Sequence, residues 1–167
     1  RFVDCDWSSD VCSSDLGLKL AANVAAMLVA FISIVAMVNY LLGFANTSID
    51  QLLGLIFQPL AWTMGVPWEE SAMMGTLMGK KIAFTELIAY GDLKVIMASG
   101  QISERTAIIA SYALCGFANF GSIGIQLGGI GGMAPERKKD LAKLVTKAMV
   151  GGALASWLTA TVAGILI

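Results

Sequence analysis

Three long runs without a charged residue constrain this sequence more than any other feature. They cover Leu20 to Phe44, Thr106 to Pro135 and Ala148 to Ile167, and none contains Asp, Glu, Lys or Arg. A helix of about 20 apolar residues crosses a hydrocarbon core of about 30 Å. In lipid only a helix or a closed barrel pairs all of its own backbone groups. These runs lack the alternation of apolar and polar residues that is typical of barrel strands. We therefore predict an all-α integral membrane protein in contact with the lipid bilayer.

The charged residues are few, and their placement indicates a topology. They make up 14% of the chain, against about 25% in a soluble domain. Basic residues gather between the second and third apolar runs; they are Arg137, Lys138, Lys139, Lys143 and Lys147. By the positive-inside rule, the connection at residues 134–140 is predicted to be cytoplasmic and the C-terminus to lie outside the cell membrane. Basic clusters also bind nucleic acid, but two flanking apolar runs favour the topological interpretation, and we expect no nucleic-acid partner.

The first 15 residues differ from the remainder of the chain. They are polar, rich in Ser and Asp, and without helical periodicity. They also lack the basic start and apolar core of a signal peptide. Two interpretations stay open, a natural loop and a foreign translation joined to a truncated gene, and we favour the second. We therefore leave residues 1–15 out of the predicted fold, as non-native or disordered, and assign residues 16–167 to it.

The spacing of apolar residues predicts two helices after this stretch. Residues 18–44 are expected to form one spanning helix. Residues 49–64 are expected to form an amphipathic helix, with Ser48 as its N-cap and Asp50 in its first turn, where an acidic side chain suits the helix dipole. The length and pattern of this second helix are typical of one that lies in the membrane interface.

Residues 69–98 are the most irregular part of the sequence. Their apolar stretches are too short to span a bilayer, and glycines and charged residues separate them. One interpretation is a re-entrant hairpin of two half-helices, which is tolerated only against protein or a water-filled cavity. The other is an exposed loop with one amphipathic helix. The pattern alone favours neither.

A second irregular region covers residues 103–133. It is apolar enough to span, but it contains seven glycines and the string CGFANFGSIGI at residues 115–125. Small residues allow close helix packing, whereas Gly together with Asn and Ser in one turn favours a broken helix. Transporters place substrate sites at such breaks near the midplane. Pro135 ends the region, and residues 136–167 are predicted to form a final helix.

Glu86 is the residue that points most clearly to a function. A carboxylate near the bilayer centre costs about 2.5–3.5 kcal/mol, and it usually faces an interior cavity on a solute or ion path. The alternative is a structural pair between Glu86 and Lys80 or Lys81. We favour the functional interpretation.

Three neutral residues of the broken helix are further candidates. Asn119 and Ser122 are three residues apart, so they would share a helix face. Their side chains are of the kind that recognises hydroxyl groups. Hydrogen bonding between helices is the alternative and, from these residues alone, the better one. Phe117 is more often a core residue than a stacking platform for a base, and it gains interest only next to Asn119.

The sequence contains no constellation of catalytic residues. It has no His, which is the commonest general base and metal ligand. It shows no nucleophile beside a base, no paired metal ligands and no phosphate-binding loop. Cys115 stands alone in an apolar helix and is assigned to packing. We therefore expect no enzymatic activity, and no metal or cofactor bound by this chain.

Five strings give the chain a resemblance to a known family. They are AAMLVAF at 25–31, GVPWEE at 65–70, GKKIAFTELIAY at 79–90, CGFANFGSIGI at 115–125 and APERKKD at 134–140. In this order, and over nearly all of the chain after its N-terminal stretch, they resemble the C-terminal half of concentrative nucleoside transporters of the bacterial type. Together the strings are specific, although no single one is.

The resemblance implies an architecture. Residues 18–44 would be a helix of the scaffold of a homotrimer, and residues 49–64 an interfacial helix on the outer side. Residues 69–98 would be a re-entrant hairpin, residues 103–133 a broken helix and residues 136–167 the final helix. The resemblance thereby decides between the two interpretations of the irregular region that precedes the broken helix.

The resemblance also implies substrate-binding residues. In the family, a Glu at the hairpin tip and an Asn and a Ser of the broken helix bind the ribose hydroxyls; by motif these match Glu86, Asn119 and Ser122. Phe117 matches an aromatic residue near the nucleoside. The family usually has Asn-Glu-Phe at the hairpin tip, whereas this chain has TEL at residues 85–87, which leaves its substrate preference open.

The implied function is that of a fragment of a cation-coupled nucleoside symporter. The fragment would supply the ribose-binding half of the substrate site. The N-terminal half of the same transporter would supply the base contacts and the sodium site, so the coupling ion of the intact protein, Na⁺ or H⁺, is not specified by this chain. A membrane scaffold or assembly subunit without transport is the alternative.

Overall fold

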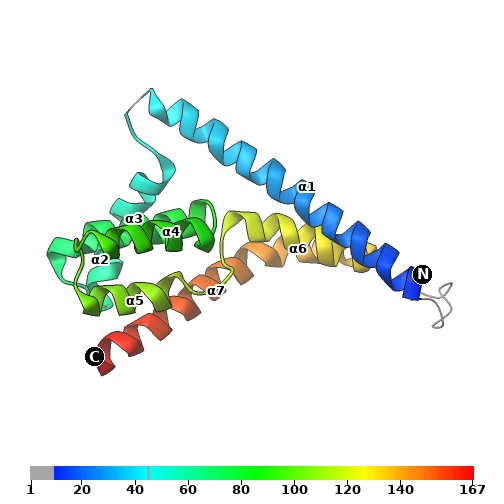
Figure 1. Cartoon of the computed structure of the whole chain (residues 1–167). Coiled ribbons are helices and arrows are strands. Elements are labelled where there is room, and N and C mark those ends of the chain that lie inside the picture. Colours follow the sequence, from blue (N-terminus) through cyan, green and yellow to red (C-terminus); the bar gives the residue numbers. More distant parts are fainter. Residues whose placement is uncertain (1–9, 45) are drawn as a thin grey trace.

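The computed structural model describes residues 10–44 and 46–167, and in this part of the chain every regular element is helical. The elements are α1 (Asp10–Gly43), α2 (Ile49–Thr63), α3 (Trp68–Ala83), α4 (Glu86–Ala98), α5 (Glu104–Leu114), α6 (Phe120–Met133), the 3₁₀ helix η1 (Pro135–Arg137) and α7 (Lys138–Leu166) (Figure 1). The predicted all-α class is confirmed. Residues 1–9, which belong to the stretch predicted to be non-native, lie outside the described residues.

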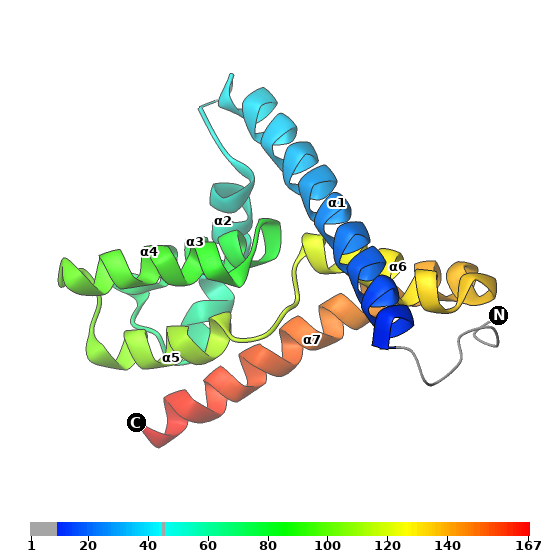
Figure 2. The same ribbon diagram turned by 45° about the vertical axis from the view of Figure 1, so that its right-hand side comes forward.

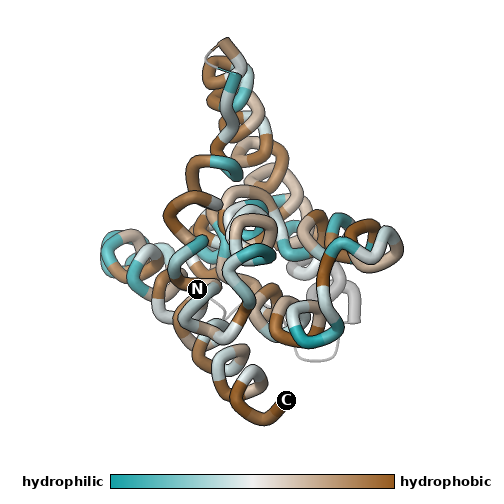
Figure 3. The backbone as a smooth tube through the Cα atoms, turned by 90° about the vertical axis from the view of Figure 1, so that its left-hand side faces the viewer, coloured by the Kyte–Doolittle hydropathy of each residue, from teal (hydrophilic) through white to brown (hydrophobic). Residues whose placement is uncertain are grey.

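Two stretches of the described chain are long and apolar enough to cross a membrane. They are Gly17–Gly43, with 27 residues, and Pro135–Leu166, with 32. The first lies in α1, which stands apart from the group formed by α2 to α5 (Figure 2). The second includes α7, which ends in a hydrophobic C-terminus (Figure 3). The remaining uncharged run, Thr106 to Pro135, does not form a third spanning helix, because it is divided into α5 and α6, of 11 and 14 residues.

The helix α1 begins at Asp10, earlier than the predicted start at Leu18. Residues 10–15, which we left out of the fold, therefore continue the same helix. Each residue added to an existing helix gains a hydrogen bond without the unfavourable step of nucleating a new helix. No proline precedes Pro59 to stop such an extension, and Ser and Asp suit the N-terminus of a helix.

The N-terminus of α2 is capped from α1. Ser48 stands at the N-cap position, as predicted, but its side chain makes no capping hydrogen bond. Instead, the backbone N–H of Ile49 donates to the side-chain oxygen of Asn39 at 2.9 Å. This bond joins the two helices near the end of α1 that lies away from α6 (Figure 1).

The helices α2 and α3 cross with their backbones in contact. A Cβ atom on Gly75 would overlap the carbonyl oxygen of Gly54, and a Cβ on Gly79 would lie 2.6 Å from the carbonyl oxygen of Asp50. Residues without side chains allow helices to approach this closely. The crossing fixes α2 against α3 and therefore against the hairpin that α3 begins.

The helices α3 and α4 form a hairpin that covers residues 68–98. Lys80 of α3 makes an ion pair with Asp92 of α4. Next to this hairpin lies α5, and the hydroxyl of Tyr90 in α4 donates to the carbonyl oxygen of Ser111 in α5 at 2.6 Å. The two helices thus occupy the region for which the resemblance implies a re-entrant hairpin.

Two further sets of contacts attach the long helices. On α6, a Cβ atom at Gly124 would lie 2.7 Å from the ring of Phe31 in α1, so the small residues of α6 make room for the side chains of α1. Near the C-terminus of α7, Nη2 of Arg105 donates to the carbonyl oxygen of Gly164 at 2.5 Å, and its Nε donates to the carbonyl oxygen of Gly65 at 3.2 Å. Arg105 therefore joins α5 to α7 and to the loop after α2.

Candidate functional site

Glu86 stands at the turn of the hairpin, as the first residue of α4. The residue is half-buried. The first turn of a helix has unpaired N–H groups and a partial positive charge, both of which favour a carboxylate at this position. Thr85, the N-cap residue, makes no side-chain capping bond, so Glu86 is the acidic group associated with this helix end.

The linker between α5 and α6 contains a glycine in a left-handed backbone conformation. It covers residues 115–119, and Gly116 has a φ of 103°, which residues with a side chain rarely adopt. A Cβ atom there would also lie 2.6 Å from the hydroxyl of Ser156 in α7. The linker is drawn out between the two helices in Figure 2. It brings the start of α6 to the turn of the hairpin.

Asn119 is held by a reciprocal cap at the start of α6. Its side-chain oxygen Oδ1 accepts a hydrogen bond from the backbone N–H of Ser122 at 2.8 Å. The Ser122 hydroxyl accepts from the backbone N–H of Asn119 at 3.3 Å and donates to the Asn119 carbonyl at 2.6 Å. Both residues are buried. Because the cap uses Oδ1, the amide nitrogen Nδ2 is the part of the side chain that is left to bond elsewhere.

That amide nitrogen donates to Glu86. The distance from Nδ2 of Asn119 to Oε2 of Glu86 is 3.1 Å, across 33 residues of sequence. Glu86 begins α4 and Asn119 caps α6, so the N-termini of two helices meet at this bond. Helix N-termini attract negatively charged and electron-rich groups. One carboxylate oxygen is thereby fixed, while the carboxylate keeps lone pairs for further hydrogen bonds.

The other two predicted residues lie differently from expectation. Ser122 is at the site, but its hydroxyl takes part in the cap. It does not share a helix face with Asn119, because Asn119 precedes the helix and has an extended backbone, with φ −142° and ψ 171°. Phe117 lies in the linker with 53% of its surface exposed. It is therefore not a core residue of this chain.

The lysines of α3 do not form the structural pair that was the alternative for Glu86. Lys80 binds Asp92. The ammonium of Lys81 donates to the carbonyl oxygens of Ala113 at 3.2 Å and Cys115 at 3.3 Å. Among the described residues, Glu86 therefore forms no ion pair with a lysine. Lys81 itself is completely buried.

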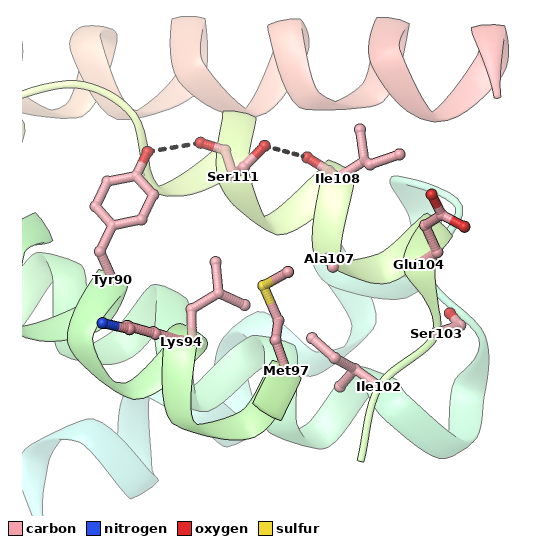
Figure 4. Close-up of a pocket in the computed structure, with 10 residues that line it drawn as sticks. Tyr90, Lys94, Met97, Ile102, Ser103, Glu104, Ala107, Ile108 and Ser111 are labelled. Carbon is pink, nitrogen blue, oxygen red and sulfur yellow. Dashed lines mark hydrogen bonds between the residues drawn. The ribbon is translucent and has the colours of Figure 1, made fainter. Parts of the chain in front are cut away.

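A separate groove of about 730 Å³ runs between α4 and α5. Figure 4 shows its lining, in which the apolar side chains of Met97 and Ile102 lie across from Ile108. The groove contains none of the four predicted site residues. In the part of the chain that the structure describes, no three His, Cys, Asp or Glu side chains gather as a metal site would require.

Residues 11–164 match the family described as Na⁺ dependent nucleoside transporter C-terminus. The chain belongs to this family. The family implied by the resemblance is thus confirmed, and membership of a transporter family places the chain in a membrane. The match begins at residue 11, within the N-terminal stretch that we had set aside.

Individual relatives of the family agree with the match. The transporter YutK of Bacillus subtilis is 44% identical over 158 residues, which cover 90% of this chain and 39% of YutK. Nucleoside permease NupC of Helicobacter pylori is 37% identical over 161 residues, which cover 90% of this chain and 38% of NupC. The structure of a single-residue variant of CNTnw in its intermediate 3 state aligns with a TM-score of 0.87 at 36% identity, over 98% of this chain and 44% of CNTnw. The chain spans about two fifths of the length of these curated relatives.

Proposed function

We propose that this chain is the C-terminal part of a cation-coupled nucleoside symporter and that Glu86 and Asn119 bind the ribose of the substrate. The observation that carries the proposal is the hydrogen bond from Asn119 to Glu86. It joins two helix N-termini around a carboxylate, in a member of a nucleoside transporter family. Transport leaves the bonds of the substrate unchanged, so the proposed function needs no catalytic residues.

The chemistry of the site suits a vicinal pair of hydroxyls. A carboxylate can accept hydrogen bonds from both ribose hydroxyls, and each charge-assisted bond contributes about 1.5–3 kcal/mol. A substrate analogue without those hydroxyls would leave a partly buried carboxylate unpaired, which is the basis of strong discrimination. In this proposal Ser122 supports Asn119 through the cap, and the exposed ring of Phe117 is available to the nucleoside.

The remaining parts of the proposal concern the intact transporter. Its coupling ion is Na⁺, in keeping with the description of the family, and ligands for that ion would come from outside this chain. The exposed apolar face of α1, which includes Ile34, Met37 and Leu41, would contact lipid and the scaffold of a homotrimer. The basic connection at 134–140 would be cytoplasmic and the C-terminus outside.

A chimera tests the proposed function. Residues 18–167 of this chain replace the matching part of NupC of H. pylori, and uptake of radiolabelled uridine and adenosine is measured in cells that lack their own nucleoside uptake. We expect saturable uptake with the same dependence on Na⁺ as that of unmodified NupC. Unmodified NupC serves as the reference for expression and insertion. A chimera that reaches the membrane in normal amount without taking up any nucleoside would favour a scaffold without transport and would contradict the proposal.

A further inference from the structure

Lys81 is a lysine in an environment that lysines rarely occupy. It is completely buried, and Lys is almost never fully buried unless it is paired. Its partners are not carboxylates but the carbonyl oxygens of Ala113 and Cys115, at 3.2 and 3.3 Å. The adjacent Lys80 has an ordinary partner in Asp92 and is partly exposed. The two neighbouring lysines of α3 therefore serve different purposes.

The carbonyls that bind Lys81 lie where α5 ends. Ala113 is in the last turn of α5, and Cys115 is its C-cap residue. The last carbonyls of a helix have no partner within it and form the negative end of the helix dipole. In transporters, such ends of broken helices coordinate cations. Here the ammonium of the chain's own lysine binds such an end.

The position of Lys81 connects the hairpin to the linker. The lysine is in α3, close before the turn that carries Glu86, and its ammonium holds the first residue of the linker, Cys115. At the other end of the same linker is Asn119, which binds Glu86. The short linker is thus attached to the hairpin at both of its ends, once through Lys81 and once through the Asn119 amide.

Lys81 lies near Glu86 but does not form an ion pair with it. The two groups lie within coulombic range of each other, yet the ion pairs of the described residues do not include them. The lone pairs of Glu86 that Asn119 does not use therefore stay available.

We propose that Lys81 is a positioning residue of the substrate site: its ammonium fixes the end of α5 and thereby sets Asn119 against Glu86. This inference rests on the proposed function. A lysine that served only to stabilise the fold would change the amount of transporter but not its selectivity. A lysine that positions the ribose-binding pair changes the discrimination between a ribonucleoside and its 2′,3′-dideoxy analogue.

The experiment measures this discrimination in the chimera with NupC. In Lys81→Met, which keeps the length of the side chain but has no donor or charge, the KM for uridine is expected to rise about tenfold, as for the loss of one good hydrogen bond. The KM for 2′,3′-dideoxyuridine should change less than about twofold. Lys80→Met is the matched control, because the same change is made one residue earlier. Its ratio of the KM for 2′,3′-dideoxyuridine to the KM for uridine should equal that of the unsubstituted chimera. Lys81→Arg keeps the charge and the donors and should restore most of the discrimination.

Two results would overturn the proposal. One is an unchanged ratio of KM values in a Lys81→Met transporter that reaches the membrane. The other is loss of every Lys81 variant from the membrane, Lys81→Arg included, because the residue would then serve only folding.

Failure of the unsubstituted chimera to transport would count against the proposed function alone. Lys81 is then tested in the 167-residue chain in membranes, with Cys5→Ser and Cys12→Ser so that Cys115 is the remaining thiol. Lys81→Met should increase the rate of thiol labelling at Cys115 several-fold, because the linker has lost its attachment. Equal rates would contradict the proposal.

Discussion

Replacing Glu86 by glutamine changes one atom of the site, and the surrounding bonds determine how the new amide must lie. Oδ1 of Asn119 is occupied by the cap, so Nδ2 is the group that faces position 86. To keep this bond, the new amide must turn its oxygen toward Asn119. Its NH₂ group, a donor without acceptor capacity, then faces the substrate. The ribose hydroxyls would have to accept hydrogen bonds where they now donate them.

The size of the effect follows from the number of bonds that lose a charged partner. Hydrogen bonds to charged groups contribute about 1.5–3 kcal/mol, and neutral ones about 0.5–1.5 kcal/mol. Weakening two of them costs about 2–3 kcal/mol, or roughly 30–150-fold in affinity. Insertion of the protein should be unaffected or improved, because the change removes a charge from within the membrane.

The assay compares uptake by Glu86→Gln and by the unsubstituted chimera, at equal amounts of protein in the membrane. Glu69→Gln is the matched control, because Glu69 is an exposed glutamate at the start of α3; its uptake should be normal. Uptake by Glu86→Gln within about threefold of the reference would refute the reasoning from hydrogen bonds. Disappearance of Glu86→Gln from the membrane, with uptake restored when Lys81 is replaced as well, would instead show that the two residues form a structural pair.

Three further predictions concern the same fold. Asn119→Ala should weaken ribonucleoside uptake by roughly 2–10-fold, less than Glu86→Gln, because it removes a neutral partner; the KM for uridine measures this. Gly75→Ala should lower the free energy of unfolding of the detergent-solubilised chimera by about 1–3 kcal/mol. The reason is overpacking, because the new Cβ would overlap the backbone of α2. Gly91→Ala is the control, because a Cβ there meets nothing within 4 Å; an equal loss of stability in both would contradict the crossing of α2 and α3. Cysteines introduced at Glu136 and Ile167 should react with an impermeant thiol reagent in intact cells only at position 167, and labelling at position 136 alone would reverse the topology.

The two long helices could be predicted because lipid leaves an apolar run few alternatives. A stretch such as that in α1 can pair its backbone groups only within a helix, so the absence of charge predicts the structure directly. The start of α1 at Asp10 could not be predicted in the same way. A polar stretch has no apolar periodicity of its own, and its helix is an extension of the one that follows.

The broken helix was predicted from its composition, but its geometry was not. The density of glycine indicates where a helix is weak. It does not reveal that Gly116 adopts a positive φ or that Asn119 stands before α6 rather than within it. The sequence does carry one signal of this, since a polar residue followed three residues later by another is the spacing of a capping box. We interpreted that spacing as a shared helix face, which is the same periodicity inside a helix.

The role of Lys81 depends on contacts that no local pattern contains. Its two carbonyl partners are 32 and 34 residues away. Adjacent residues of a helix point in directions about 100° apart, so one of two consecutive lysines can face Asp92 while the other faces the end of α5. Which lysine does which is decided by the packing of α3 against α4 and α5, and therefore only by the folded structure.

The most direct test of the account is a structure of the chimera with a ribonucleoside bound. We predict that the carboxylate of Glu86 accepts hydrogen bonds from the ribose hydroxyls, at oxygen-to-oxygen distances of about 2.5–3.0 Å. The bond from Nδ2 of Asn119 to Glu86 and the bonds from Lys81 to the end of α5 should both be retained. A nucleoside bound with its ribose away from Glu86, and with that carboxylate paired to Lys81, would contradict the account.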